Sequence, residues 1–120
     1  MPKKTTTIIT VIVLLIIGLL IIIFQGRKDY DAFATCLADQ GFIMAGSDHC
    51  NHCQTQKQMF RGAFEDVIIP RGAYKNCDYD SQWCEQVGIS GYPTWVTPDG
   101  NHLLGTQSFT TLKRISGCNL

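Results

Sequence analysis

The chain has 120 residues, which suits one domain, and its ten basic and ten acidic residues leave no net charge. Residues 27–120 hold eight of the basic and all ten acidic residues, so this part has a net charge of −2, which argues against a nucleic-acid-binding surface. All six cysteines also lie there, at a density typical of an oxidising compartment.

The N-terminal segment is an almost unbroken apolar run over residues 8–24. Its length reaches the short end of what crosses a bilayer, about 17 to 25 residues. A cleaved signal peptide would have a shorter apolar core and an early small-residue cleavage site, whereas the one Ala-x-Ala sequence begins at Ala32. We therefore predict an uncleaved single-pass membrane anchor over residues 1–26, a short linker over residues 26–28, and a domain over residues 27–120.

The orientation of this anchor is predicted from the cysteines. Charges on the two sides of the apolar run are almost balanced, so the positive-inside rule hardly decides which side of the membrane the C-terminal domain occupies. Because six cysteines suit an oxidising compartment, we expect the C-terminal domain to be extracytoplasmic.

The first half of the domain predicts a helix, a strand and a second helix. Asp29 can cap a helix that ends at Gly41. The short apolar run over residues 42–46 then predicts a buried strand. After a turn, a second helix begins at or near Cys50, with apolar residues at helical spacing up to Phe64.

The second half predicts a strand, a short helix, a hairpin and a last helix. Residues 66–70, DVIIP, predict a strand ended by proline, and residues 71–76 are a loop or a resumption of that strand. Asp80 or Ser81 caps the short helix, which Gly88 closes. The segments PTWVT and HLLGT flank the turn PDGN, which predicts a hairpin, and Ser108 caps the last helix.

This order of elements indicates an α/β domain with a small mixed sheet. The first two strands are joined by a helical crossover, so they should be parallel, and the last two form an antiparallel hairpin. We expect helices on both faces of the sheet.

A pair of cysteines, Cys50 and Cys53, carries the chemistry that the sequence predicts. At the start of a helix, unpaired amides and the helix dipole stabilise an anion, so Cys50 is placed to act as a thiolate nucleophile. Cys53, one turn later, can attack a mixed disulfide and release the product. His52 can donate a hydrogen bond or carry charge near Cys50, which would favour the reduced form. Gln54 stands where a c-type haem site needs histidine, which excludes that site.

The segment GYPTW, residues 91–95, leads into the hairpin and supports a redox site. Pro93 is a candidate cis-proline at the start of a strand that passes beside the dithiol. It lacks an amide donor and shapes the surface where a substrate chain can lie. Tyr92 should flank the same site, where substrate contact and packing are equally open interpretations.

These segments together resemble the thioredoxin superfamily. The sequence looks most like the thioredoxin-like domain fused to bacterial and plant homologues of vitamin K epoxide reductase. The likeness rests on FATCL, the strand before CNHCQ, NCDYDSQWCEQVGISGYPTW and GTQSFTTLKRISG, and it covers nearly all of residues 31–117. It implies a thioredoxin fold, thiol–disulfide exchange, Cys50 as nucleophile, Cys53 as resolving thiol and Pro93 as cis-proline.

The sequence also departs from that pattern. His49 replaces the usual aromatic residue before the first cysteine, and Met44 stands where thioredoxins place a buried acid. Proton transfer from Cys53 must then use water, His49, or an acid such as Glu65 or Asp48. No reductase bundle follows the anchor in this sequence, so a quinone-linked partner would be a separate protein.

The remaining cysteines predict one structural bridge. Cys77 and Cys84, seven residues apart, are interpreted first as a structural disulfide, with free buried thiols or an electron relay as alternatives. Cys36 and Cys118 lie on the first and last helices of the domain. They would pair only if those helices are neighbours, and unpaired thiols are the favoured prediction.

The predicted activity is that of a membrane-anchored thiol–disulfide oxidoreductase that acts on extracytoplasmic protein thiols, with an oxidase slightly favoured. The predicted protein is a monomer that needs no cofactor and whose redox partner is a separate membrane quinone-linked reductase. The alternative is a non-enzymatic metal-binding or metallochaperone domain. That domain would use a set of cysteines and histidines: Cys50, Cys53, Cys77, Cys84, His49 and His52.

Overall fold

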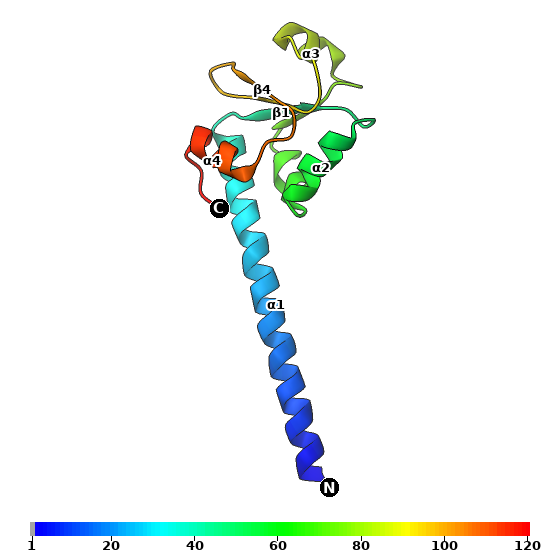
Figure 1. Ribbon diagram of the computed structural model, residues 1–120, viewed down its shortest axis with the longest axis vertical. Coiled ribbons are helices and arrows are strands. Elements are labelled where there is room, and N and C mark those ends of the chain that lie inside the picture. Colours follow the sequence, from blue (N-terminus) through cyan, green and yellow to red (C-terminus); the bar gives the residue numbers. More distant parts are fainter. Residues whose placement is uncertain (1) are drawn as a thin grey trace.

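The computed structural model describes residues 2–120 and consists of a long helix that carries a small α/β domain at its C-terminal end (Figure 1). The elements follow one another as α1 (Pro2–Asp39), β1 (Ile43–Gly46), α2 (Asn51–Met59), the π-helix η1 (Phe64–Ile68), β2 (Tyr74–Asn76), α3 (Ser81–Val87), β3 (Thr94–Val96), β4 (His102–Leu104) and α4 (Phe109–Ser116).

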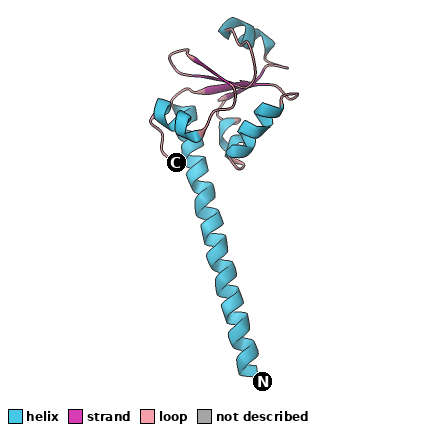
Figure 2. Cartoon of the chain, in the orientation of Figure 1, coloured by secondary structure: helices cyan, strands magenta, loops and turns pink. Residues whose placement is uncertain are grey.

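The four strands form one mixed sheet in the order β2-β1-β3-β4. β1 is parallel to β2 and antiparallel to β3, and β3 pairs with β4 as an antiparallel hairpin. α3 lies on one face of the sheet, and α2, α4 and the end of α1 lie on the other (Figure 2). The mixed sheet, the final hairpin and the helices on both faces are thereby confirmed. The first two strands are parallel as predicted, but the second of them lies at residues 74–76.

The helix α1 runs without a break from the apolar segment into the domain. The apolar residues between Ile8 and Phe24 are exposed, whereas Phe33, Ala34 and Leu37 in the last turns of the helix are fully buried. Of the helices in residues 2–120, α1 is long and apolar enough to span a membrane.

The predicted linker over residues 26–28 is therefore helical, and Asp29 lies within α1 and starts no helix. A glycine such as Gly26 costs a helix about 1 kcal/mol relative to alanine, which strong helix-forming segments on both sides can tolerate.

The core beneath the sheet is built around the ring of Phe60. Its centroid lies 5.0 Å from that of Phe109, 5.8 Å from Phe64, 6.0 Å from Trp95 and 6.1 Å from Phe33. These rings come from the segment after α2, from α4, η1, β3 and α1, so one aromatic cluster joins five parts of the chain. Such rings bury large apolar areas and stabilise a domain of this size.

The strand predicted over residues 66–70 is wrong, because this segment continues the π-helix η1 and the turn after it. Phe64 and Ile68 are four residues apart and both are fully buried, while Ile69 is exposed. The packing of this helical face outweighs the β propensity of the valine and isoleucines. An ion pair between Arg27 and Asp66 joins η1 to α1. The second strand is β2, within the segment where the sequence allowed a strand to resume.

Candidate functional site

Cys50 lies at the N-terminus of α2, where its sulfur caps the helix. It is the N-cap residue, and its Sγ accepts a hydrogen bond from the backbone amide of Cys53 at 3.1 Å. β1 ends at Gly46 and a turn follows, which brings the chain to Cys50 in an extended conformation. The sulfur is thus held where unpaired amides and the helix dipole favour negative charge.

Cys53 lies one turn further into α2 and is fully buried, whereas Cys50 is half-buried, and both are free thiols. Burial, and then the hydrogen bond to Cys50, raise the pKa of Cys53 to about 12, while the Ser47 amide and Lys57 act in the opposite direction. Cys53 therefore keeps its proton at neutral pH. An incoming sulfur can reach Cys50 but not Cys53.

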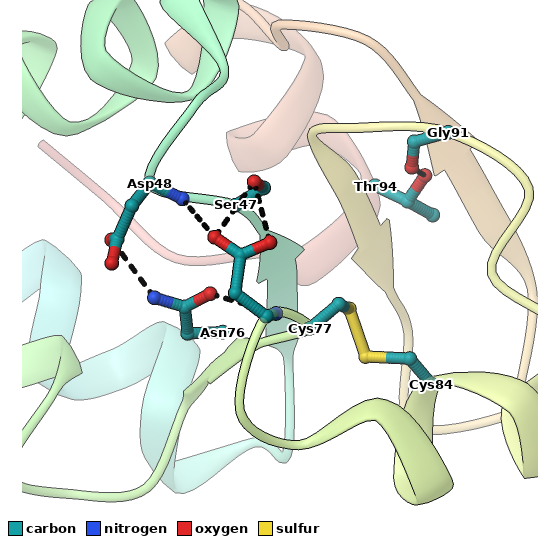
Figure 3. The surroundings of a disulfide bond; sticks show 8 residues. Ser47, Asp48, Asn76, Cys77, Cys84, Gly91 and Thr94 are labelled. Carbon is teal, nitrogen blue, oxygen red and sulfur yellow. Dashed lines mark hydrogen bonds between the residues drawn. A yellow bond between two sulfur atoms is a disulfide. The ribbon is translucent and has the colours of Figure 1, made fainter.

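A carboxylate that the sequence did not single out, Asp78, holds the turn before Cys50. Ser47 Oγ donates hydrogen bonds to its two carboxylate oxygens at 2.8 and 2.9 Å, and the Asp48 amide donates at 2.8 Å (Figure 3). The Asp48 amide, followed by the Ser47 hydroxyl, lowers the pKa of Asp78. Asn76 Nδ2 in turn donates to Asp48 Oδ1 at 2.8 Å. The segment after β2 thus positions the turn that leads to the dithiol.

The two histidines of the motif are both exposed. The His49 side chain is 90% exposed, and its Nδ1 lies 3.5 Å from Asp78 Oδ2. His52 is on the first turn of α2, and its backbone carbonyl accepts a hydrogen bond from Thr106 Oγ1 at 3.2 Å. His49, which the sequence offered as one route for proton transfer from Cys53, is therefore a neighbour of the Asp78 carboxylate.

The sheet register brings Pro93 to the same edge as the dithiol. Ala45 of β1 pairs with Thr94 of β3, so the residue before Thr94 lies beside the end of β1 that leads to Cys50. The peptide bond between Tyr92 and Pro93 is cis. Pro93 is buried and Tyr92 is 41% exposed, which leaves the tyrosine ring available at the surface.

The other four cysteines form two disulfides. Cys77 and Cys84 are joined across the turn between β2 and α3, with an S–S distance of 1.97 Å and a Cα–Cα distance of 5.8 Å (Figure 3). Both are buried against Ala45 of β1. This bridge ties α3 to the segment that carries Asp78.

The expectation that Cys36 and Cys118 are unpaired is wrong. They form a disulfide with a Cα–Cα distance of 5.9 Å, which is within the range that a bridge requires. Gly117 caps the C-terminus of α4, and its left-handed conformation with φ of 73° turns the chain back toward α1. The Gln40 side-chain amide lies against both sulfurs, at 3.6 and 3.5 Å.

The cysteines predicted as an alternative metal site do not form one group. Two of the four, Cys77 and Cys84, are bonded to each other and have no free thiolate. Within residues 2–120, no set of three or more His, Cys, Asp or Glu residues is arranged to hold a metal ion. The free dithiol and the disulfides favour redox chemistry over a metal centre.

Comparison with known proteins points to the same chemistry. No protein-family model matches the chain. The chain is similar to the thiol-disulfide oxidoreductase LTO1 of Arabidopsis thaliana, with 33% identity over 94 residues. The match covers 74% of this chain but 24% of the plant protein, so the chain spans about a quarter of that relative's length. This likeness and the free Cys50–Cys53 pair support a thiol–disulfide oxidoreductase activity.

Proposed function

We propose that this chain is a membrane-anchored thiol–disulfide oxidoreductase with a thioredoxin fold. The anchor comprises residues 1–26, of which residues 2–26 belong to α1, and the catalytic domain comprises residues 27–120. A mixed four-stranded sheet with the dithiol helix after β1 and a cis-proline before β3 supports this fold. The observation that carries the function is the pairing of a reachable sulfur at a helix N-terminus, Cys50, with a buried thiol, Cys53.

The proposed reaction begins with the oxidised Cys50–Cys53 disulfide. A substrate thiolate attacks Cys50 Sγ, a new S–S bond forms, and the electron pair of the broken bond remains on Cys53. A second thiolate of the same substrate then attacks the substrate sulfur and releases Cys50 as a thiolate. The substrate loses two electrons and gains a disulfide, and the enzyme becomes a dithiol. In the opposite direction, Cys53 attacks the mixed disulfide and resolves it.

We assign the remaining site residues to shaping this reaction. The strand register brings Pro93 to the edge of the sheet that leads to the dithiol, and Pro93 and Tyr92 would bind the substrate chain there. His52 would tune the stability of the reduced form. An oxidase is slightly favoured, because a histidine between the cysteines promotes the dithiol state. The proposed domain is monomeric and extracytoplasmic, and it would be reoxidised by a separate quinone-linked membrane reductase.

The test of this function uses the full chain in detergent. Its dithiol is titrated against glutathione, and its metal content is measured by mass spectrometry, with a Cys50→Ser/Cys53→Ser variant as control. The wild type should form one exchangeable disulfide that the control lacks. Stoichiometric metal and no exchangeable disulfide would contradict the proposal.

A trapping experiment tests the substrate class. A Cys53→Ser variant lacks the resolving thiol, so it should accumulate mixed disulfides between Cys50 and protein thiols in cells. A reactive Cys50 that traps no protein would rule out protein substrates. A reporter after Leu120 tests the orientation, and a cytoplasmic signal would contradict the extracytoplasmic location.

A further inference from the structure

Tyr74, the first residue of β2, has a buried hydroxyl group with no bonding partner. Its Oη is inaccessible to solvent and makes no hydrogen bond to any of the residues 2–120. The ring itself is half-buried and packs edge-on against Phe64, with centroids 5.3 Å apart. A buried donor without a partner lowers the stability of the fold, so such a group usually has a functional or structural reason.

The hydroxyl of Tyr74 and the sulfur of Cys53 border the same small volume above Gly46. A Cβ atom placed on Gly46 would lie 3.1 Å from Tyr74 Oη and 3.3 Å from Cys53 Sγ. Any larger residue at position 46 would therefore separate or displace the two groups. The glycine at the end of β1 lets the phenol approach the buried thiol.

A cation from the dithiol helix packs on the ring of Tyr74. Lys57, on the same helix as Cys53, places its Nζ 4.3 Å from the centroid of the Tyr74 ring. A cation over an aromatic face is attracted by the ring, so Lys57 helps to hold Tyr74 against the helix that carries Cys53.

The phenol stays protonated at neutral pH. Burial raises the pKa of Tyr74, and the negative charges of Cys53, Asp48, Asp78 and Cys50 raise it further. Tyr74 therefore acts as a donor and not as a base. Its hydroxyl proton needs an accepting group, and the charged form of the neighbouring sulfur is such a group.

We propose that the Tyr74 hydroxyl donates a hydrogen bond to Cys53 Sγ when this sulfur becomes an anion. The inference rests on the proposed function. As a substrate thiolate bonds to Cys50 Sγ, the Cys50–Cys53 bond breaks and its electron pair stays on Cys53 Sγ. The Tyr74 hydrogen bond stabilises this buried thiolate until a proton from solvent neutralises it. No oxidant or reductant other than the substrate is needed.

This role replaces a group that the sequence lacks. Met44 occupies the position of the buried acid of thioredoxins, and its side chain is fully buried. Of the other candidates, Glu65 and His49 are exposed. Asp48 accepts a hydrogen bond from Asn76. Tyr74 is paired with Met44 in the parallel register of β1 and β2, so the neighbouring strand supplies the polar group.

The test measures how fast dithiothreitol opens the Cys50–Cys53 disulfide in the oxidised full chain. Tyr74→Phe keeps the ring and its packing but removes the hydroxyl. A hydrogen bond to a charged group is worth enough to change a rate by about tenfold, so opening should slow by about tenfold or more. Tyr79→Phe is the matched control, because Tyr79 is 80% exposed, and it should open at the wild-type rate.

A second readout separates leaving-group stabilisation from a structural effect. In the reduced proteins, alkylation of Cys50 by iodoacetamide places no negative charge on Cys53 Sγ. Tyr74→Phe should therefore leave the rate of Cys50 alkylation unchanged. The inference would be overturned if the disulfide of Tyr74→Phe opened at the wild-type rate. It would also be overturned if the variant slowed Cys50 alkylation as much as it slowed disulfide opening. A wild-type chain with no exchangeable disulfide would instead contradict the proposed function.

Discussion

The carboxylate of Asp78 accepts a hydrogen bond from the backbone amide of Asp48 at 2.8 Å, across 30 residues of sequence. The same carboxylate accepts from the hydroxyl of Ser47. Asp78 directly follows Cys77, which is bonded to Cys84 of α3. The turn that leads to Cys50 is thus fixed by a segment on the other side of the parallel strand pair.

Asp78→Asn should weaken this link and change the acid sensitivity of the fold. The Asp48 amide and Ser47 hydroxyl depress the pKa of Asp78 in the folded state. Ionised Asp78 therefore stabilises the fold above the ordinary carboxyl pKa of about 3.9, and this stability is lost as pH falls through the lower folded value. Thermal unfolding between about pH 5 and pH 2 should show a smaller loss of stability in Asp78→Asn than in the wild type.

The matched control for this prediction is Asp80→Asn. Asp80 precedes α3, and within residues 2–120 its side chain makes no capping hydrogen bond. Its pH profile should follow the wild type. Equal profiles for wild type and Asp78→Asn would show that the Asp78 network contributes no acid-sensitive stability.

The two disulfides should differ in how much they stabilise the fold. In the loop-entropy model, removing the Cys77–Cys84 bridge costs about 2–3 kcal/mol, and removing Cys36–Cys118 costs about 4–5 kcal/mol. The difference arises because the pairs are separated by 7 and 82 residues. Denaturant unfolding of the two double-alanine variants measures both values. A larger cost for the shorter loop would contradict this account.

Gln56 should be a strong determinant of stability although it is polar. It is fully buried on α2, and its Oε1 accepts from Trp95 Nε1 at 3.1 Å and from the Gln107 amide at 2.6 Å. Gln56→Leu leaves both donors unpaired and should lower the free energy of unfolding by about 2–4 kcal/mol. Gln58→Leu, an exposed position on the same helix, should change it little. Similar losses in both variants would contradict the role of these hydrogen bonds.

The reduced protein should lose stability in the alkaline range because of Cys53. Its pKa is raised from 9.0 to about 12 in the folded state, so the fold holds a proton that the unfolded chain releases. This contribution is complete below pH 9 and is lost as pH rises toward 12. The free energy of unfolding, measured with denaturant under reducing conditions, should fall more steeply with rising pH in the wild type than in Cys53→Ala. Tyr74 is present in both proteins, so parallel curves would contradict the prediction.

The dithiol could be predicted from sequence because its determinants are local. A buried strand, a turn and the helix that begins after Cys50 lie within 17 residues, from Ile43 to Met59. The hairpin and the cap of the last helix are also local, and Ser108 Oγ does accept from the Thr111 amide at 3.1 Å. Local turn and capping chemistry accounts for both.

The partners of the dithiol could not be predicted, because they depend on strand register. Tyr74 and Cys53 border the same space above Gly46, and Asp78 bonds to Ser47, only because β1 and β2 pair with Gly46 opposite Asn76. The sequence instead placed the second strand at residues 66–70, which would have moved each of these side chains. The Cys36–Cys118 bridge likewise depends on how α1 and α4 meet, which no local pattern encodes.

The unbroken course of α1 gives the proposed enzyme a stiff stalk in place of a tether. Its last turns carry Phe33 in the aromatic core, and Cys36 is bonded to the C-terminal segment. From Phe24 to Phe33 the axis advances about 14 Å without a hinge. Rotation or tilt of the apolar stem would therefore swing the reactive face with it. The active site of such an enzyme would stay at a fixed height above the bilayer, and the reacting sulfurs of its partners would have to lie at that height.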